Sequence, residues 1–205
     1  MFSDIIHYFN AGGIVMYPLV LLLIIVGMIG IERVFFYNTF RKDAVRLHKN
    51  AMSAEDTASW NDLIALFNEA ESPLMSAVYL VTNNTKNRTN LESRYDDLVT
   101  MSAMDLKKGL DWVSMVVTMA PLLGLLGTVI GMIRSFQVIG GGTGAPLVIT
   151  GGVGEALVAT ATGLCVALVA LIIHSYCAHV ANGLISFMEF NLGRMLDLYD
   201  GNHED

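Results

Sequence analysis

Charged residues are scarce in this sequence. They make up 15% of its 205 residues, whereas hydrophobic residues make up 54%. A soluble domain has about 25% charged and about 45–50% apolar residues. The formal net charge is −7, and an acidic chain does not have the basic surface that phosphate backbones require, so we expect no nucleic-acid partner. The composition points instead to segments that lie in membrane lipid.

Cysteine is nearly absent as well. The two cysteines, Cys165 and Cys177, lie in one apolar segment. If that segment is a helix, their spacing separates them by roughly 18 Å, and a disulfide needs Cα atoms within about 7 Å. Spacings such as CxxC and HExxH are also missing. We therefore expect no disulfide, no metal site and no cofactor. Because no nucleophile–base set stands out, we also expect no catalytic residues and no enzymatic activity.

Three stretches are apolar and long enough to cross a bilayer, which takes ~20 helical residues. They are expected at residues 13–36, 112–138 and 147–178. Glu32 and Arg33 lie at the end of the first stretch, where such side chains reach the membrane interface. This stretch is longer than the hydrophobic part of a signal peptide, and no Lys or Arg precedes it. We interpret it as an anchor.

Basic residues predict the orientation of these spans. Nine of the 12 Lys and Arg residues lie in residues 37–111, whereas residues 1–12 and 139–146 contain none. Because basic residues stay on the cytoplasmic side, we expect the N-terminal segment and the short loop outside. Residues 37–111 and the C-terminal helix or tail at 179–205 are then cytoplasmic. The predicted fold class is all-α: an integral membrane protein with three transmembrane helices and long cytoplasmic helical extensions.

The segment between the first two spans is predicted to be helical. Ser59 is a candidate cap for a helix with an apolar stripe at residues 63–67. Ser72 followed by proline is a second helix start, because proline is favoured at the first helical position. After a polar loop, Thr89 and Glu92 have the spacing of a capping box. The helix that begins there is expected to run unbroken into the second span.

The second span carries closely spaced glycines in the sequence APLLGLLGTVIGMIR, residues 120–134. Gly124, Gly127 and Gly131 are three or four residues apart and so share a helix face, and the last two form a GxxxG pattern. Small residues let helices approach closely in lipid. Thr128 lies beside this face with its hydroxyl at membrane depth. Arg134 is either an ordinary interface residue or a partner for a charge on another helix.

The third span combines small residues with polar ones. A stripe for close packing runs through positions 156, 160, 163, 167 and 170, and it includes Gly163. Glu155 and Thr162 share another face at i and i+7. Thr160 lies about 140° round from Glu155 on an ideal helix. The Gly-rich run at residues 140–144 precedes this span, and we interpret it as a turn because it lacks the Lys-Ser/Thr of a phosphate loop.

Glu155 is the most informative single residue. A carboxylate in an apolar span costs ~2.5 kcal/mol or more and usually faces an interior path. The alternative is that Glu155 lies near the outer end of the span and reaches headgroup water. The threonines are less informative, because an intramembrane hydroxyl often bonds to a carbonyl of its own helix. His174 and His179 fit a proton relay or, more simply, the inner interface.

The motifs resemble those of a known family. Residues 120–136, APLLGLLGTVIGMIRSF, are similar to the MotA/TolQ/ExbB proton-channel signature. Residues 151–164, GGVGEALVATATGL, resemble the third-span motif of the ExbB and TolQ branch. The first span, GIVMYPLVLLLIIVGMIGIERVFFY, is similar to that branch too. The resemblance covers nearly the whole chain, and the short length favours an ExbB-like member.

The resemblance implies a partner-dependent, proton-driven motor in the bacterial inner membrane. The chain would form a homo-oligomeric ring, a pentamer, around a single-span partner of the ExbD/TolR type. Proton passage to an aspartate of that partner would energise a TonB-like or TolA-like protein, for TonB-dependent import or Tol–Pal function. Motif matching puts the pore residues at Thr128, Glu155 and Thr160. Thr162 is added from helix geometry alone.

Three other functions are weighed against this one. A MotA-like flagellar stator subunit usually has four spans and a larger cytoplasmic domain. A membrane scaffold would use the small-residue faces only for assembly and would tolerate substitution of Glu155. A solute transporter is disfavoured, because three spans with no broken-helix pair leave little room for a midplane site.

Overall fold

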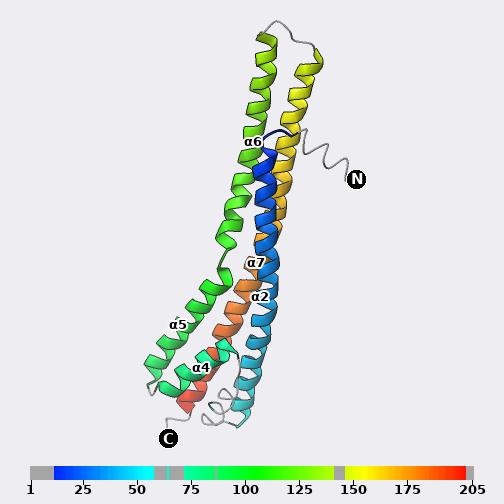
Figure 1. Cartoon of the computed structure of the whole chain (residues 1–205). Helices are drawn as coiled ribbons and strands as arrows, with labels where there is room; N and C mark the ends of the chain where they lie inside the picture. Colours follow the sequence, from blue (N-terminus) through cyan, green and yellow to red (C-terminus); the bar gives the residue numbers. More distant parts are fainter. Residues whose placement is uncertain (1–11, 58–63, 65–71, 86, 141–145, 202–205) are drawn as a thin grey trace. The chain divides into compact units, whose positions relative to one another are not determined.

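The computed structural model describes residues 12–57, 64, 72–85, 87–140 and 146–201. Every regular element in these ranges is an α-helix, which confirms the all-α class (Figure 1). The helices are α2 (Met16–Thr57), α4 (Pro73–Asn84), α5 (Arg88–Lys107), α6 (Leu110–Gly140) and α7 (Pro146–Gly201). The predicted helix capped by Ser59 lies outside the described residues except for Ile64. Of the predicted Gly-rich turn at residues 140–144, Gly140 is the last residue of α6, and the rest also lies outside the described residues.

Three of the helical stretches are long and apolar enough to cross a membrane, as the sequence predicts. Their most apolar windows have mean hydropathies of 2.5, 2.1 and 2.6, in Met16–Ser53, Arg88–Gln137 and Thr150–Tyr199. Large apolar side chains are exposed along them in the single chain: Leu21 is 59% exposed, Leu122 64% and Leu168 61%. Soluble monomers rarely expose so much apolar surface. The chain is therefore a multi-pass membrane protein.

The helices extend well past the apolar stretches that the sequence marks. α2 has 42 residues and α7 has 56, whereas ~20 helical residues cross a bilayer. The predicted third span (147–178) and the start of the predicted C-terminal segment (179–205) are thus one continuous helix. At ~1.5 Å per residue, α7 is much longer than a bilayer is thick, so part of it lies outside the hydrocarbon.

The chain divides into two compact units. Unit 1 comprises Met1–Glu32 and Gly109–Tyr176, and unit 2 comprises Arg33–Lys108 and Cys177–Asp205. The core of unit 1 is made by the starts of α2 and α6 and the middle of α7. Its buried members are Val15, Leu19, Val26, Val113, Val116, Ala120, Val166, Ala167 and Ala170. Valine and alanine dominate this core, so the helix backbones lie close together.

Unit 2 packs α4 and α5 against the remaining parts of α2 and α7. Its buried core is Leu47, Ala51, Leu74, Met75, Val78, Leu91, Tyr95, Met188, Leu192, Met195 and Tyr199. The predicted start at Ser72 is confirmed, since its side chain accepts a hydrogen bond from Met75 N and Pro73 opens α4. The predicted capping box is wrong. The helix starts two residues earlier than the box predicts: Asn87 caps α5 by accepting from Thr89 N, and asparagine is among the preferred capping residues.

The prediction of one unbroken helix from the Thr89 region into the second span is also wrong. α5 ends at Lys107 and α6 begins at Leu110. Gly109 between them has φ +81°, a left-handed conformation that glycine adopts without strain. Two side chains of α2 bond the last carbonyls of α5: Arg33 Nη1 donates to Asp105 O and Tyr37 Oη to Leu106 O, both at 2.9 Å.

Candidate functional site

The predicted glycine faces lie between α6 and α7 of unit 1, which run side by side there (Figure 1). A Cβ added to Gly124 would stand 3.1 Å from Thr160 Cα and 3.2 Å from Ala159 O. A Cβ on Gly163 would stand 2.6 Å from Ala120 O. The two helices therefore touch backbone to backbone at this level, which only small residues permit.

The contact continues for two more turns of α6. A Cβ added to Gly127 would be 2.5 Å from the Ala159 Cβ, and one added to Gly131 would be 2.8 Å from the Ala156 Cβ. Ala156 and Ala159 are 2% and 1% exposed. We call this contact, from Gly124 and Gly163 to Gly131 and Ala156, the glycine seam.

Of the three predicted threonines, Thr160 makes a bond between helices. Its Oγ1 donates to Gly124 O at 2.9 Å, across the glycine seam. Thr128 donates to Leu125 O at 2.6 Å and Thr162 to Val158 O at 2.8 Å, so both bond within their own helices. A hydroxyl has one hydrogen and two lone pairs. Thr160 Oγ1 therefore still accepts a hydrogen bond while it holds α7 to α6.

Glu155 lies at the other end of the seam, one residue before Ala156. Its Oε1 is 3.3 Å from Arg134 Nη1 of α6. The side chain of Glu155 is 30% exposed and that of Arg134 is 54% exposed. Arg134 was expected to be either an interface residue or a charge partner across helices. The 3.3 Å contact shows that it is a charge partner.

A third element meets the same carboxylate oxygen. Gly13, in the turn before α2, lies so close that a Cβ placed on it would collide with Glu155 Oε1. Gly13 has φ +69°, and its carbonyl accepts from Met16 N at 3.2 Å, where α2 begins. The Glu155 carboxylate therefore lies between α6 and the start of α2.

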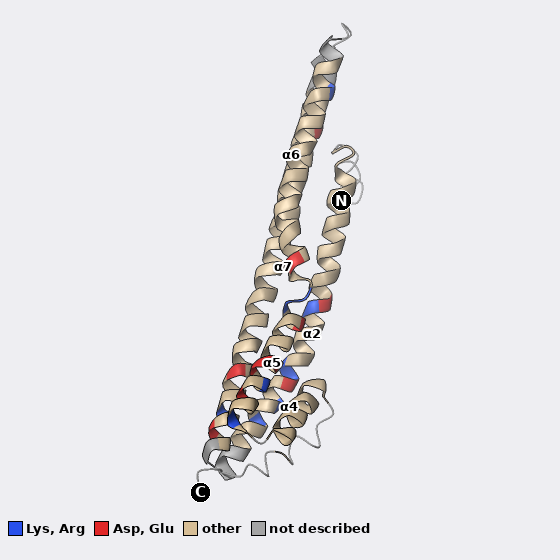
Figure 2. Cartoon of the chain, turned by 90° about the vertical axis from the view of Figure 1, so that its left-hand side faces the viewer, with Lys and Arg blue, Asp and Glu red and all other residues tan. Residues whose placement is uncertain are grey.

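The surroundings of this charge pair are apolar. In the described part of unit 1, the other Asp, Glu, Lys and Arg residues are Glu32 and Asp111. Asp111 is in the first turn of α6, roughly 35 Å from Arg134 at ~1.5 Å per residue. Accordingly, the helices of unit 1 are almost wholly tan in Figure 2. Among the Asp, Glu, Lys and Arg residues that the structure describes in unit 1, Glu155 and Arg134 are each other's nearest opposite charge.

No metal-binding group of three His, Cys, Asp or Glu residues occurs in the described ranges. Both cysteines are free, with Cys165 exposed and Cys177 buried. The polar groups along and beside the glycine seam include the hydroxyls of the three threonines, the Glu155 carboxylate and the Arg134 guanidinium. Such groups can hold and pass protons or ions.

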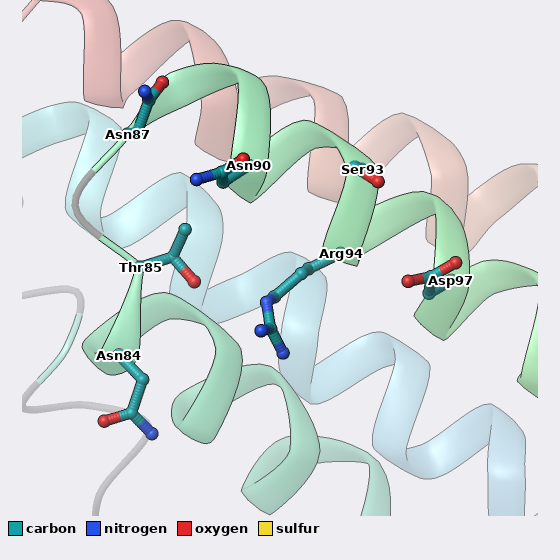
Figure 3. A pocket seen from close by; sticks show the side chains of 7 residues that line it. All are labelled: Asn84, Thr85, Asn87, Asn90, Ser93, Arg94 and Asp97. Atoms are coloured by element: carbon teal, nitrogen blue, oxygen red, sulfur yellow. The ribbon is translucent and has the colours of Figure 1, made fainter.

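Two hollows in unit 2 contain none of the predicted site residues. One, of about 590 Å³, lies between the end of α4 and the start of α5. Arg94 extends into it from α5 (Figure 3). The other, of about 330 Å³, is apolar and is lined by α2, α4 and α5, with Phe36, Phe40 and Met101 among its walls.

Gly13 is not among the predicted site residues. Residue 13 was expected only as the start of a span, because no local sequence signal connects this glycine with a carboxylate 142 positions later. Arg134 was detectable, because it is an opposite charge in a neighbouring apolar span.

Comparison with known proteins gives a consistent result. The model of the MotA/TolQ/ExbB proton channel family matches residues 66–189, which include the whole glycine seam, Thr160 and Glu155. A putative biopolymer transport protein, ExbB-like 3 of Synechocystis, is 32% identical over 167 residues, 79% of each chain. Biopolymer transport protein exbB1 of Vibrio cholerae is 28% identical over 165 residues, covering 78% of this chain and 72% of that protein. A putative ExbB homolog of Methanothermobacter thermautotrophicus is 24% identical over 179 residues, 85% of this chain and 63% of its own.

Proposed function

The chain belongs to the MotA/TolQ/ExbB proton channel family, and we propose that it is the ExbB-like channel subunit of a proton-driven motor in the inner membrane. The observation that carries this proposal is the position of Glu155. It is the one carboxylate in the described part of α7 within unit 1, and it lies at the end of a tight α6–α7 contact. A carboxylate is retained in such apolar surroundings at a cost of ~2.5 kcal/mol or more, which favours a functional role.

In this proposal, α6 and α7 form one wall of a proton path. Thr160 contributes an oxygen that accepts a hydrogen bond while its own hydrogen bonds Gly124 O. Thr128 and Thr162 are further pore-lining residues, and their bonds to their own helices also leave lone pairs free to accept. Each of these hydroxyls is thus available to a water molecule or a protonated group that passes along the wall.

The wall needs a partner to complete it. The described parts of α6 and α7 in unit 1 contain no second carboxylate near Glu155. We propose that copies of this chain form a ring, a pentamer, around a single-span ExbD/TolR-like partner whose aspartate supplies the missing relay. The exposed apolar side chains of α2, α6 and α7 suit contact with lipid and with neighbouring copies.

The proposed output is mechanical. Protonation neutralises the partner's carboxylate and lets it pass an apolar surface, so that proton flow turns one component against the other. The names of the similar proteins, biopolymer transport proteins of the ExbB type, favour a TonB-like recipient over a TolA-like one. The N-terminus would lie outside and the C-terminus in the cytoplasm, as the basic residues predict.

The test is proton flux into proteoliposomes that contain the chain alone or co-purified with its aspartate-bearing partner. We expect flux only with both proteins. Glu155→Gln should abolish it, and Thr160→Val should lower it about tenfold, because valine has the shape of threonine but no oxygen. Thr160→Ser, which keeps the hydroxyl, is the matched control and should retain most of the flux.

The oligomer must be checked in each variant by its size in detergent. An intact wild-type complex that conducts no protons would refute the channel proposal and favour a membrane scaffold. Equal flux through Glu155→Gln and wild type would leave a channel but remove Glu155 from its path.

A further inference from the structure

We propose that Gly13 and Arg134 are positioning residues for the Glu155 carboxylate, and that proton flux depends on both. The inference rests on the proposed function, because it concerns how the proposed pore carboxylate is held. It goes beyond that function by assigning a role to the turn before α2, a helix that contributes none of the pore residues named above.

Arg134 holds the carboxylate from α6. Its Nη1 contacts Oε1 at 3.3 Å, and an arginine side chain has five N–H donors in a rigid fork. A lysine in this position would keep the charge without the fork. Because the described part of unit 1 has no other Lys or Arg, no second lysine or arginine there can take over this contact.

Gly13 restricts the carboxylate from a different element, the turn before α2. The same oxygen, Oε1, faces the bare Cα of Gly13, where a Cβ would collide with it. The position of Gly13 is itself determined by the start of α2, because its carbonyl bonds Met16 N. Its φ of +69° adds a second reason for glycine. An alanine here would push the carboxylate away from its observed position.

The two contacts act on one oxygen from two elements, so together they define where the carboxylate lies. Geometry of this kind matters for proton transfer, since donor and acceptor must come within hydrogen-bond reach. A carboxylate displaced by a methyl group no longer meets the same neighbours. We therefore expect both residues to affect flux without being proton carriers themselves.

The first experiment compares two glycine variants in the reconstituted complex. Gly13→Ala should lower proton flux about tenfold or more, since small misplacements of a reacting group cost that much. Gly109→Ala is the matched control. Gly109 also has a positive φ, +81°, but its added Cβ would make only an ordinary contact, 3.5 Å from Ile29 Cγ2. The control carries similar backbone strain and should keep most of the flux.

A second variant tests whether Gly13 acts through Glu155. Glu155→Asp shortens the side chain by one methylene and should lower flux on its own. In the double variant the shorter carboxylate no longer collides with the alanine, so Gly13→Ala should cause no further loss. If instead the flux of the double variant falls by the product of the two single losses, Gly13 does not act through Glu155.

Two substitutions of Arg134 separate the effect of its charge from that of the shape of its guanidinium. Arg134→Gln should lower flux about tenfold, and Arg134→Lys should restore part of it, because the cation is kept and the fork is not. These variants also decide the outcome if Gly13→Ala fails to assemble. If Arg134→Gln then conducts like the wild type, the inference is wrong.

The possible outcomes distinguish the positioning role of Gly13 and Arg134 from the proposed channel function. No flux in the wild-type complex refutes the channel itself. Wild-type flux together with equal flux in Gly13→Ala, Gly109→Ala and Arg134→Gln overturns the positioning role and leaves the channel standing.

Discussion

Gly163→Ala is the substitution that most directly probes the contact between α6 and α7. In the middle of a helix, alanine normally stabilises relative to glycine by about 1 kcal/mol. We expect the opposite here, because the space that a methyl group needs is already filled by the backbone of α6.

The size of the effect follows from three distances. The new Cβ would stand 2.6 Å from Ala120 O, 3.0 Å from Gly124 Cα and 3.1 Å from Gly124 N. All three are backbone atoms, so no side-chain rotation relieves the overlap. Parting the helices by roughly 0.4 Å brings the first distance to 3.0 Å and stretches the Thr160–Gly124 bond from 2.9 Å to roughly 3.3 Å, beyond the range of a good O–H···O bond. Overpacking of this kind costs about 1–3 kcal/mol.

The assay is the free energy of unfolding in mixed detergent micelles, measured for Gly163→Ala and for Gly151→Ala. Gly151 is also a helical glycine of α7 in unit 1, but a Cβ there would meet nothing within 4 Å. The gain in helix propensity cancels between the two variants, so their difference isolates the steric cost of about 1–3 kcal/mol. If both variants unfold with the same free energy, the helices do not pack as closely as described.

Two further predictions concern unit 2. Tyr37→Phe should lower its stability by about 1–3 kcal/mol, because Leu106 O is left without its buried donor, whereas the same change at the exposed Tyr176 should have little effect in the same unfolding assay. Burial raises the pKa of Tyr95 above its ordinary 10.0, so the stability that this residue contributes is complete below pH 10 and is lost as the pH rises further. The stability difference between wild type and Tyr95→Phe should therefore stay constant up to about pH 10 and shrink as the pH rises above it, and a difference that stays constant above pH 10 would contradict this.

The tyrosine prediction has a definite structural basis. Thr82 Oγ1 donates its one hydrogen to Val78 O at 2.7 Å. The 2.8 Å contact between Thr82 Oγ1 and Tyr95 Oη must therefore use the tyrosine's hydrogen. Ionisation removes that hydrogen and leaves a charge in a site that is 2% exposed.

Several features were predictable because they depend on short-range pattern. A run of about 20 apolar residues must be helical in lipid, since no water is there to bond its backbone, so three spans follow from composition. Gly124, Gly127 and Gly131 recur at helical spacing, and the close packing of that face follows from their size. Glu155 could be selected as a candidate from its cost in apolar surroundings, and its role in a pore stays a prediction.

The start and the end of α5 were predicted wrongly, because more than one local conformation fits the sequence at each point. Thr89 and Glu92 match a capping box, yet Asn87 takes the capping role from two positions earlier. The break at Gly109 was not predicted, because a glycine in an apolar helix is compatible with both a helical and a left-handed conformation.

The three spans, the small-residue faces and the carboxylate in an apolar span could all be derived from local sequence, because periodicity and transfer energy act on neighbouring residues. Which hydroxyl bonds across helices depended on tertiary packing: Thr160 reaches Gly124 O because the glycines bring α6 within range, whereas Thr162 donates to a carbonyl of its own helix. Tertiary packing also decided that Gly13 and Arg134 meet one oxygen of Glu155. Those contacts join residues far apart in the chain, and their distances depend on how whole helices pack.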